Sequence, residues 1–381
     1  MPGWLPAPEA QEAVRVQRKF SLAVVGMLGF ALTLTACGDD EDGGGSDNGD
    51  GGDTGTSVEG KVGVILPDTE SSVRWESADR PELEKAFEAA GVEYTIQNAE
   101  GDAEKMGTIA DGMIADGVTV LAIVNLDSES GAAIQEEAAA QGVKTIDYDR
   151  LTLGGSADYY VSFDNTVVGE LQGQGLADCL GDKPANIVYL NGSPTDNNAT
   201  LFSAGAHSVL DPITSYTVVG EQAVPDWDNE QAVTIFEQLF TQADGKVDGV
   251  LAANDGLGGS VISVLEENGL AGQVPVTGQD ATVEGLQNVL AGTQCMTVYK
   301  SAKLEAGALA DAAIALVNGE EAETTGTTED SEGGRDVPSI LLEPVSITKD
   351  NVKDVIDDGG QTAADVCTGE YAALCAEAGI S

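Results

Sequence analysis

Residues 187–199 read IVYLNGSPTDNNA, so an apolar run passes abruptly into a polar one. Residues 187–190 predict a buried strand, and the pattern becomes helical from Ala199. The polar residues between them would lie at the carboxyl end of a parallel strand, where ligands of open α/β folds bind. Because Asx residues and Pro also form ordinary turns, this stretch alone leaves two interpretations open, a hydrogen-bonding loop and a simple turn.

Short apolar runs alternate with amphipathic helical segments on both sides of this stretch. Strands that alternate with helices of about ten to fifteen residues predict βαβ units and parallel sheets. The alternation comes in two rounds of similar size, which predicts an α/β protein with two Rossmann-like doubly wound lobes. Residues 319–335 predict an exposed loop. The expected strands are 61–66, 94–97, 120–124, 144–148, 159–163, 186–190, 216–220, 249–252, 274–277, 295–299 and 340–345. The expected helices are 78–90, 103–115, 131–140, 167–180, 199–210, 230–242, 257–268, 283–290 and 301–317.

The composition limits the possible partners. At 381 residues the chain is long enough for two domains. Its 17 Lys and Arg against 65 Asp and Glu give a formal net charge of −48. Nucleic acids and anionic lipid surfaces would repel such a chain, so neither is an expected partner.

The first 37 residues have the pattern of an export signal. A basic segment with Arg15, Arg18 and Lys19 precedes an apolar run, 20–34, that is too short for a comfortable membrane span. The run ends in Leu-Thr-Ala-Cys and resembles a bacterial lipobox, which implies cleavage before Cys37 and lipidation of its thiol. An ordinary signal peptide with a chance cysteine is the alternative.

Residues 38–59 are nearly all Gly, Asp, Ser and Thr, a composition that behaves as a flexible linker. Together with Cys37 they predict an exported lipoprotein at the outer face of the cytoplasmic membrane or in the periplasm. Its membrane contact would be through the lipid anchor alone.

The remaining cysteines, Cys179, Cys295, Cys367 and Cys375, are even in number, which favours disulfides in an exported chain. Cys367 and Cys375 flank a short helical turn and are the first expected pair. Cys179 with Cys295 follows by elimination. Since the sequence has no CxxC spacing and a single His, no metal site is expected.

Polar and aromatic side chains follow the predicted strands where each strand ends. By the carboxyl-end rule they would line one crevice between the lobes. Arg and Lys supply donors and Asp supplies acceptors in nearly equal number, which favours a neutral ligand. Two Trp planes suit the C–H face of a sugar ring, and hydroxyls would take hydrogen bonds in the ring plane. The candidate binding residues are Arg74, Trp75, Asp149, Arg150, Asp196, Asn197, Trp227, Asn254, Asp280 and Lys300.

No GxGxxG follows the first strand, and GxxxxGK[ST] is absent, so neither a dinucleotide nor ATP is indicated and no cofactor is expected.

Several motifs occur from about Lys61 onward, namely Arg74-Trp75, Tyr148-Asp149-Arg150, 162–165, 192–199, Trp227, Asn254-Asp255, 278–281 and 297–300. In these motifs the chain resembles bacterial periplasmic sugar-binding proteins of the type I class, most closely those that bind D-xylose for ABC importers. The run 337–342 also resembles their last crossing between lobes.

The resemblance implies that the candidate residues above bind xylose, with Asp196 the weakest of them. Asn197 is expected to touch the sugar and Asn198 only to shape the turn. Hinge crossings are implied near Asn165, Tyr299 and Leu342. The implied lobes are 60–164 with 299–341, and 165–298 with 342–381. The implied protein is a monomer without enzymatic activity, and its partners are a monosaccharide and an ABC permease with its ATPase subunits.

Three other functions are alternatives for such a sequence. A sugar-responsive transcription regulator of this fold would need a basic DNA-binding helix-turn-helix in place of the lipobox. A sugar-converting enzyme could use Asp149 and Asp280 as an acid/base pair, but each has a cationic neighbour, and a Ser-His-Asp triad has only His207 to draw on. A chemoreceptor-coupled binder of another pentose or hexose would have a similar pocket.

Overall fold

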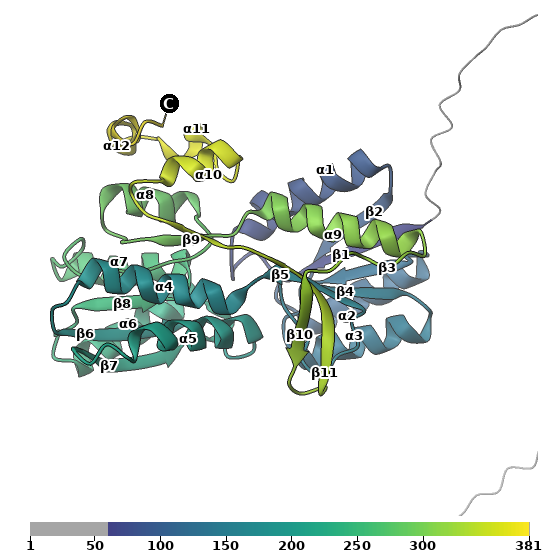
Figure 1. Ribbon diagram of the computed structural model, residues 1–381, viewed down its shortest axis with the longest axis horizontal. Coiled ribbons are helices and arrows are strands. Elements are labelled where there is room, and N and C mark those ends of the chain that lie inside the picture. Colours follow the sequence, from purple (N-terminus) through teal and green to yellow (C-terminus); the bar gives the residue numbers. More distant parts are fainter. Residues whose placement is uncertain (1–59, 381) are drawn as a thin grey trace, which may run out of the picture. The chain divides into compact units, whose positions relative to one another are not determined.

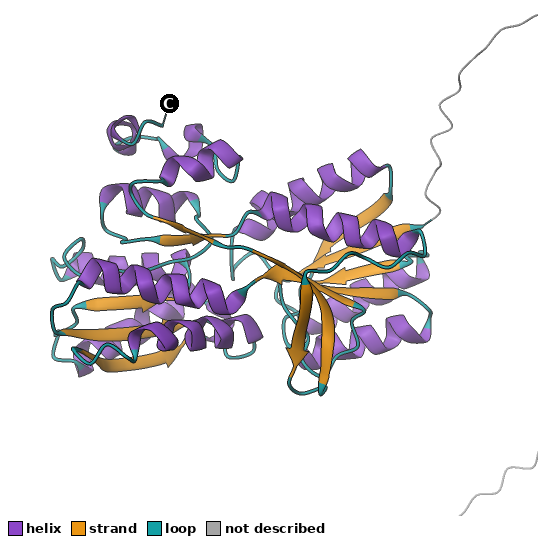
Figure 2. Ribbon diagram, in the orientation of Figure 1, coloured by secondary structure: helices purple, strands orange, loops and turns teal. Residues whose placement is uncertain are grey.

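The computed structural model describes residues 60–380 of the chain. The predicted signal segment 1–37 with Cys37 and the predicted linker 38–59 lie outside the described residues. Residues 60–380 fold into two groups of strands and helices, named here the first and the second lobe (Figures 1 and 2).

The first lobe is a sheet with helices packed on it. Its strands are β1 (Lys61–Leu66), β2 (Glu93–Asn98), β3 (Val120–Ile123), β4 (Lys144–Tyr148), β5 (Tyr159–Phe163), β10 (Gly326–Asp330) and β11 (Arg335–Leu342). Its helices are the π-helical turn η1 (Trp75–Asp79), α1 (Arg80–Ala90), α2 (Ala103–Ala115), α3 (Ser128–Ala140) and α9 (Ala302–Val317). The strand order is β10-β11-β5-β4-β3-β1-β2, and only β10 and β11 pair antiparallel.

Side chains of β1 pack on both faces of this sheet. Val64 belongs to the core cluster that includes α1 and α9, whereas Ile65 belongs to the cluster that includes α2 and α3. A parallel sheet covered on both faces has no polar side, which explains why its central strands β1 and β3 are almost continuous apolar runs.

The second lobe also packs helices on strands, but its strands form one three-stranded and one two-stranded sheet. Its strands are β6 (Ala185–Asn191), β7 (Tyr216–Ala223), β8 (Gly249–Ala252), β9 (Thr297–Tyr299) and β12 (Val345–Ile347). Its helices are α4 (Asn165–Leu180), α5 (Asn197–Leu210), the 3-10 turn η2 (Pro225–Trp227), α6 (Asn229–Gln242), α7 (Asp255–Glu267), α8 (Val283–Ala291), α10 (Val352–Asp358), α11 (Ala363–Val366) and α12 (Tyr371–Glu377). Strands β7-β6-β8 are parallel, and β12 pairs antiparallel with β9. The two-lobed α/β architecture predicted from the sequence is thus confirmed.

The structure corrects one strand prediction and one loop prediction, and it divides the predicted strand 340–345 between β11 and β12. Residues 274–277 do not form a strand, because only Val276 bridges to Val250. The predicted loop 319–335 contains β10 and the start of β11, which form a hairpin. Asp330 stabilises the hairpin turn by accepting hydrogen bonds from the backbone N–H of Gly154 and Gly333, both at 2.8 Å.

The chain crosses between the lobes after β5, after β9 and after β11. The first and third crossings run side by side, since Leu342 pairs with Phe163 and its carbonyl accepts a hydrogen bond from the Asp164 N–H at 3.0 Å. These crossings fall next to the residues where hinges are expected.

Both predicted cysteine pairs lie at disulfide-bonding distance. The Cα atoms are 5.7 Å apart for Cys367 and Cys375, and 6.6 Å apart for Cys179 and Cys295. Among the described residues, no helix has both the length and the apolar character needed to cross a bilayer.

Candidate functional site

A small polar cavity lies between the two lobes, next to the loop 68–74. All of the predicted binding residues except Asn197 line it. They are joined by Ser71, Ser72, Asn198, Phe202 and Gln279, which the sequence interpretation did not select. The lining from the predicted set is Arg74, Trp75, Asp149, Arg150, Asp196, Trp227, Asn254, Asp280 and Lys300.

Asn198, rather than Asn197, faces this cavity. Asp196 caps α5 by accepting a hydrogen bond from the Asn198 N–H at 2.9 Å, so the helix begins at Asn197. Asn198 and Phe202 are four residues apart and therefore share a helix face, the one turned to the cavity. Asn198 Nδ2 donates to the Asp149 carbonyl at 2.9 Å and to Asp149 Oδ1 at 3.1 Å. The cavity lining thus includes Asn198, which was expected only to shape the turn, and not Asn197, which was expected to touch the ligand.

Asp149 is the anionic centre of the first lobe's wall. It follows β4 with a φ of 62°, and its Oδ2 lies 3.1 Å from Arg74 Nη1 and 3.5 Å from Lys300 Nζ. Burial opposes ionisation, but the charges of Lys300, Arg74 and Arg150 outweigh it and lower the pKa of Asp149. Lys300 is also 3.7 Å from Asp280 Oδ1, so this cation connects carboxylates from both lobes.

Arg150 and Asp196 form a second ion pair across the lobes, with 3.1 Å between Nε and Oδ2. Both side chains are buried. Asp196 also accepts a hydrogen bond from Trp227 Nε1 at 3.2 Å. Burial raises the pKa of Asp196, and the neighbouring Arg150 charge opposes this rise. Asp196 thus caps a helix, orients a tryptophan and meets a cation of the opposite lobe.

The two tryptophans are held in place by their polar edges. Trp75 Nε1 donates to Ser71 Oγ at 3.0 Å, and the Arg74 guanidinium lies 4.6 Å from the Trp75 ring centroid. Trp227 meets Phe202 edge to face, with 6.5 Å between the ring centroids. Both indoles are almost fully buried while also lining the cavity. They supply rigid apolar surface beside the charged groups.

Asn254 and Asp280 connect the second lobe to the loop before Arg74. Asn254 caps α7 with its Oδ1 and donates from Nδ2 to the Ser71 carbonyl at 3.2 Å. Asp280 sits at a φ of 92° and accepts a hydrogen bond from Ser72 Oγ at 2.9 Å. Its loop is held from behind by Asp255, whose carboxylate accepts from the Thr282 N–H at 2.8 Å.

Two buried acids behind the cavity were not selected from the sequence. Asp79 and Glu305 both contact Arg74 and are fully buried. Neither residue directly follows a predicted strand, so the carboxyl-end rule did not select them. No group of three or more His, Cys, Asp or Glu is arranged to hold a metal ion within residues 60–380.

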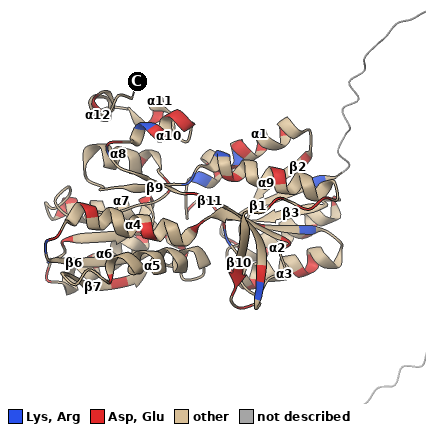
Figure 3. Cartoon of the chain, in the orientation of Figure 1, with Lys and Arg blue, Asp and Glu red and all other residues tan. Residues whose placement is uncertain are grey.

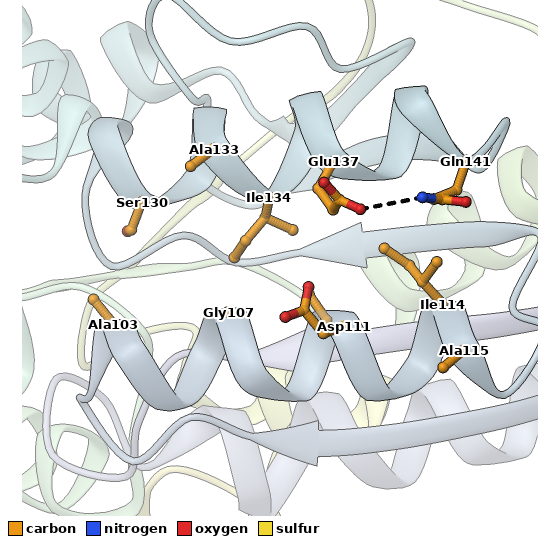
Figure 4. Close-up of a pocket in the computed structure, with 11 residues that line it drawn as sticks. Ala103, Gly107, Asp111, Ile114, Ala115, Ser130, Ala133, Ile134, Glu137 and Gln141 are labelled. Carbon is orange, nitrogen blue, oxygen red and sulfur yellow. Dashed lines mark hydrogen bonds between the residues drawn. The ribbon is translucent and has the colours of Figure 1, made fainter. Parts of the chain in front are cut away.

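A second hollow lies on the first lobe between α2 and α3, away from the predicted residues. Figure 4 shows it lined by small apolar side chains such as Ala103 and Ala133, with Asp111 and Glu137 projecting into it from the two facing helices. Glu137 is bonded within its own helix to Gln141 at 3.3 Å. Acidic side chains are spread over both lobes, whereas Lys and Arg are few (Figure 3). The interlobe cavity differs from this hollow because buried Arg and Lys side chains meet buried carboxylates in it.

The family model of the periplasmic binding protein domain matches residues 62–321. The chain belongs to this family. The D-xylose-binding periplasmic protein of Escherichia coli (strain K12) is 39% identical to this periplasmic binding protein over 303 residues, covering 78% of this chain and 90% of the relative. The multiple sugar-binding periplasmic receptor ChvE of Rhizobium radiobacter is 36% identical over 326 residues, covering 80% and 92%.

Solved structures agree with this assignment. The carbohydrate transporter solute binding protein from Chloroflexus aurantiacus, in complex with D-glucose, superposes with a TM-score of 0.74 at 30% identity, over 80% of this chain and 97% of that one. The family and its fold are those of substrate-binding proteins rather than enzymes. This periplasmic binding protein is accordingly a sugar-binding protein of the extracytoplasmic type.

Proposed function

We propose that this protein binds one neutral monosaccharide, D-xylose first among the candidates, in the interlobe cavity and delivers it to the permease of an ABC importer. The observation that carries the proposal is the pairing of every cavity cation with a carboxylate. Arg74 and Lys300 contact Asp149, and Arg150 contacts Asp196. Because no cation is left over for an anionic ligand, hydroxyl groups suit these donors and acceptors best.

The choice of D-xylose draws on the relatives. Proteins named for D-xylose binding are 36–39% identical to this chain, but others are named for multiple sugars, and a structural neighbour holds D-glucose. A pentose differs from its hexose counterpart by one hydroxymethyl group. We therefore place xylose first and keep other pentoses and hexoses, and a role in chemoreception, as alternatives.

The proposed mechanism is closure of two lobes on the sugar. The lobes would be 60–164 with 299–341 and 165–298 with 342–381, and would rotate about the crossings near Asn165, Tyr299 and Leu342. A ligand that contacts both walls at once stabilises only the closed form and so shifts the open–closed equilibrium. ATP hydrolysis would belong to separate subunits of the importer.

Export and anchoring complete the proposal. The lipobox-like sequence before Cys37 supports a lipoprotein on the outer face of the cytoplasmic membrane, with 38–59 as its linker. Metabolic labelling with a fatty acid should mark the wild type and not Cys37→Ser. Equal labelling of both proteins would contradict anchoring at Cys37.

Isothermal titration of the purified protein against xylose, ribose, arabinose, glucose and galactose tests the function. Saturable binding of one or a few of these sugars, with no turnover, is the expected result. Absence of binding to all five would contradict the proposal, and conversion of any of them would favour an enzyme instead.

A further inference from the structure

Three carboxylates hold the guanidinium of Arg74. Asp79 accepts from Nε at 2.8 Å and from Nη2 at 2.6 Å, in the bidentate geometry that fixes an arginine plane. Glu305 accepts a second hydrogen bond from Nη2 at 2.5 Å, and Asp149 accepts from Nη1 at 3.1 Å. The Tyr148 hydroxyl donates to Asp79 Oδ1 at 2.7 Å and so anchors the Asp79 carboxylate in turn.

One N–H group of the Arg74 guanidinium remains for a ligand. A guanidinium has five N–H groups, and the carboxylates engage four of them. The fifth is on Nη1, beside Asp149, and both Arg74 and Asp149 line the cavity. Asp79 and Glu305 do not line it. They do not touch a bound sugar, so their geometric effect on it passes through the direction of the last Arg74 N–H.

Glu305 also ties together separate parts of the first lobe. It lies in the first turn of α9, shortly after Lys300, where the chain has returned from the second lobe. Its Oε2 bonds Arg74 from the loop before α1, while Asp149 from the end of β4 contacts both Arg74 and Lys300. Two cavity cations are thereby positioned by one buried network.

We propose that Glu305, supported by Asp79, is a positioning residue for sugar binding: it orients Arg74 so that one Nη1 N–H points to a sugar hydroxyl. Purely structural ion pairs would contribute to lobe stability alone, whereas a positioning residue also changes sugar affinity. The inference deepens the proposed function and rests on it.

A proton on Glu305 provides a readout that a purely structural role would not give. Burial raises the pKa of Glu305 to about 8, a rise that Arg74 opposes and that Asp149 and Asp79 increase. Opening of the lobes would admit water to the cavity and make ionisation of the Glu305 carboxyl easier. Closure on the sugar would therefore take up protons at Glu305. By linkage, sugar affinity should fall as pH rises through the pKa of Glu305. The titratable and charged groups around Glu305 are Arg74, Asp79, Tyr148, Asp149, Tyr160 and Lys300.

The test is titration of the full chain with D-xylose, and with D-glucose if xylose does not bind, between pH 6.5 and 9. Glu305→Ala should raise Kd about tenfold or more at pH 7, as expected for loss of a hydrogen bond to a charged group. Glu305→Gln keeps an acceptor for Nη2 and should bind within about threefold of the wild type at pH 7, without the fall in affinity at alkaline pH. Asp311→Asn, an exposed change in the same helix, is the matched control and should behave as the wild type.

The outcomes separate the two proposals. A wild type that binds neither sugar contradicts the proposed function and this inference with it. A wild type that binds, together with a folded Glu305→Ala of unchanged affinity or a Glu305→Gln with the wild-type pH profile, overturns the role of Glu305 alone. If Glu305→Ala does not fold, the pH profile of Glu305→Gln decides.

Discussion

Ser72 and Asp280 are 208 residues apart in the chain, yet the Ser72 hydroxyl donates a 2.9 Å hydrogen bond to the Asp280 carboxylate. Ser72 belongs to the loop that leads into Arg74, and Asp280 to the loop before α8. The neighbouring Ser71 carbonyl accepts from Asn254 of the second lobe in the same way. One short loop of the first lobe therefore makes adjacent hydrogen bonds to two cavity residues of the second.

Ser72→Ala should weaken sugar binding by destabilising the closed form. A hydrogen bond to a charged group contributes about 1.5–3 kcal/mol, so removing this one should raise Kd about ten- to a hundredfold. It should also increase the radius of gyration of the sugar-free protein in small-angle scattering. Ser77→Ala is the control, since its exposed hydroxyl bonds only to the Val73 carbonyl within its own turn. An unchanged or lower Kd in Ser72→Ala would contradict a closing role for this contact.

Trp227→Ala should reduce sugar affinity more than about a hundredfold, because it removes both the aromatic surface and the donor to Asp196. Trp227→Phe keeps an aromatic plane and should lose about tenfold or less. Titration calorimetry measures both, with circular dichroism to verify folding. Phe240→Leu, an aromatic change on α6 away from the cavity, should leave Kd unchanged. Equal sugar affinity in Trp227→Ala and the wild type would contradict the assignment of Trp227 to the sugar-binding cavity.

Gly192 lies against Trp227 so closely that a Cβ at this position would overlap the indole ring. Gly192→Ala should therefore displace the ring, lower the free energy of unfolding by about 1–3 kcal/mol and raise Kd. Chemical denaturation and sugar titration measure the two effects. Gly112→Ala is the matched control, because nothing lies near its would-be Cβ in α2, and it should be neutral or about 0.5–1 kcal/mol more stable. A Gly192→Ala variant with native stability and affinity would show that the indole position is not critical.

Much of this arrangement could be predicted from the sequence because a parallel sheet gathers its strand ends at one edge. Arg150 and Asn254 follow predicted strands, and the structure places both on the cavity wall. The short Asx-rich stretch after β6 is harder to interpret. Whether Asn197 or Asn198 faces inward depends on the residue at which α5 begins, and Asp196 sets that position through its cap.

The carboxyl-end rule does not predict the buried acids behind Arg74. Asp79 and Glu305 lie in helical segments, where charged residues usually face solvent. Their burial follows from meeting one arginine, and Glu305 is 231 residues from it in the chain. No local pattern marks such a pairing. The β10–β11 hairpin was missed for a related reason, because its acidic, Gly-containing sequence is also typical of an exposed loop.

His207, the only histidine of the chain, gives a prediction about stability and pH. Its ring stacks on Tyr189 with 4.2 Å between centroids, and its nitrogens lie 2.9 Å from Asp211 and 3.2 Å from Glu221. Burial alone would lower the pKa of His207, but the hydrogen bonds to these two carboxylates outweigh it and raise the pKa. The protonated ring thus stabilises the folded form.

Since the pKa is higher in the folded than in the unfolded chain, this contribution is fully present below the unfolded value, about 6.5, and is lost as pH rises through the folded value. His207→Gln should therefore lower Tm near pH 5.5 and have a smaller effect near pH 8.5. The ion pairs are partly exposed, so the difference should stay below about 1 kcal/mol. Subtracting the variant's Tm from the wild-type Tm at each pH removes the background titration of the many carboxylates. A difference that grows with pH would contradict a stabilising charge on His207.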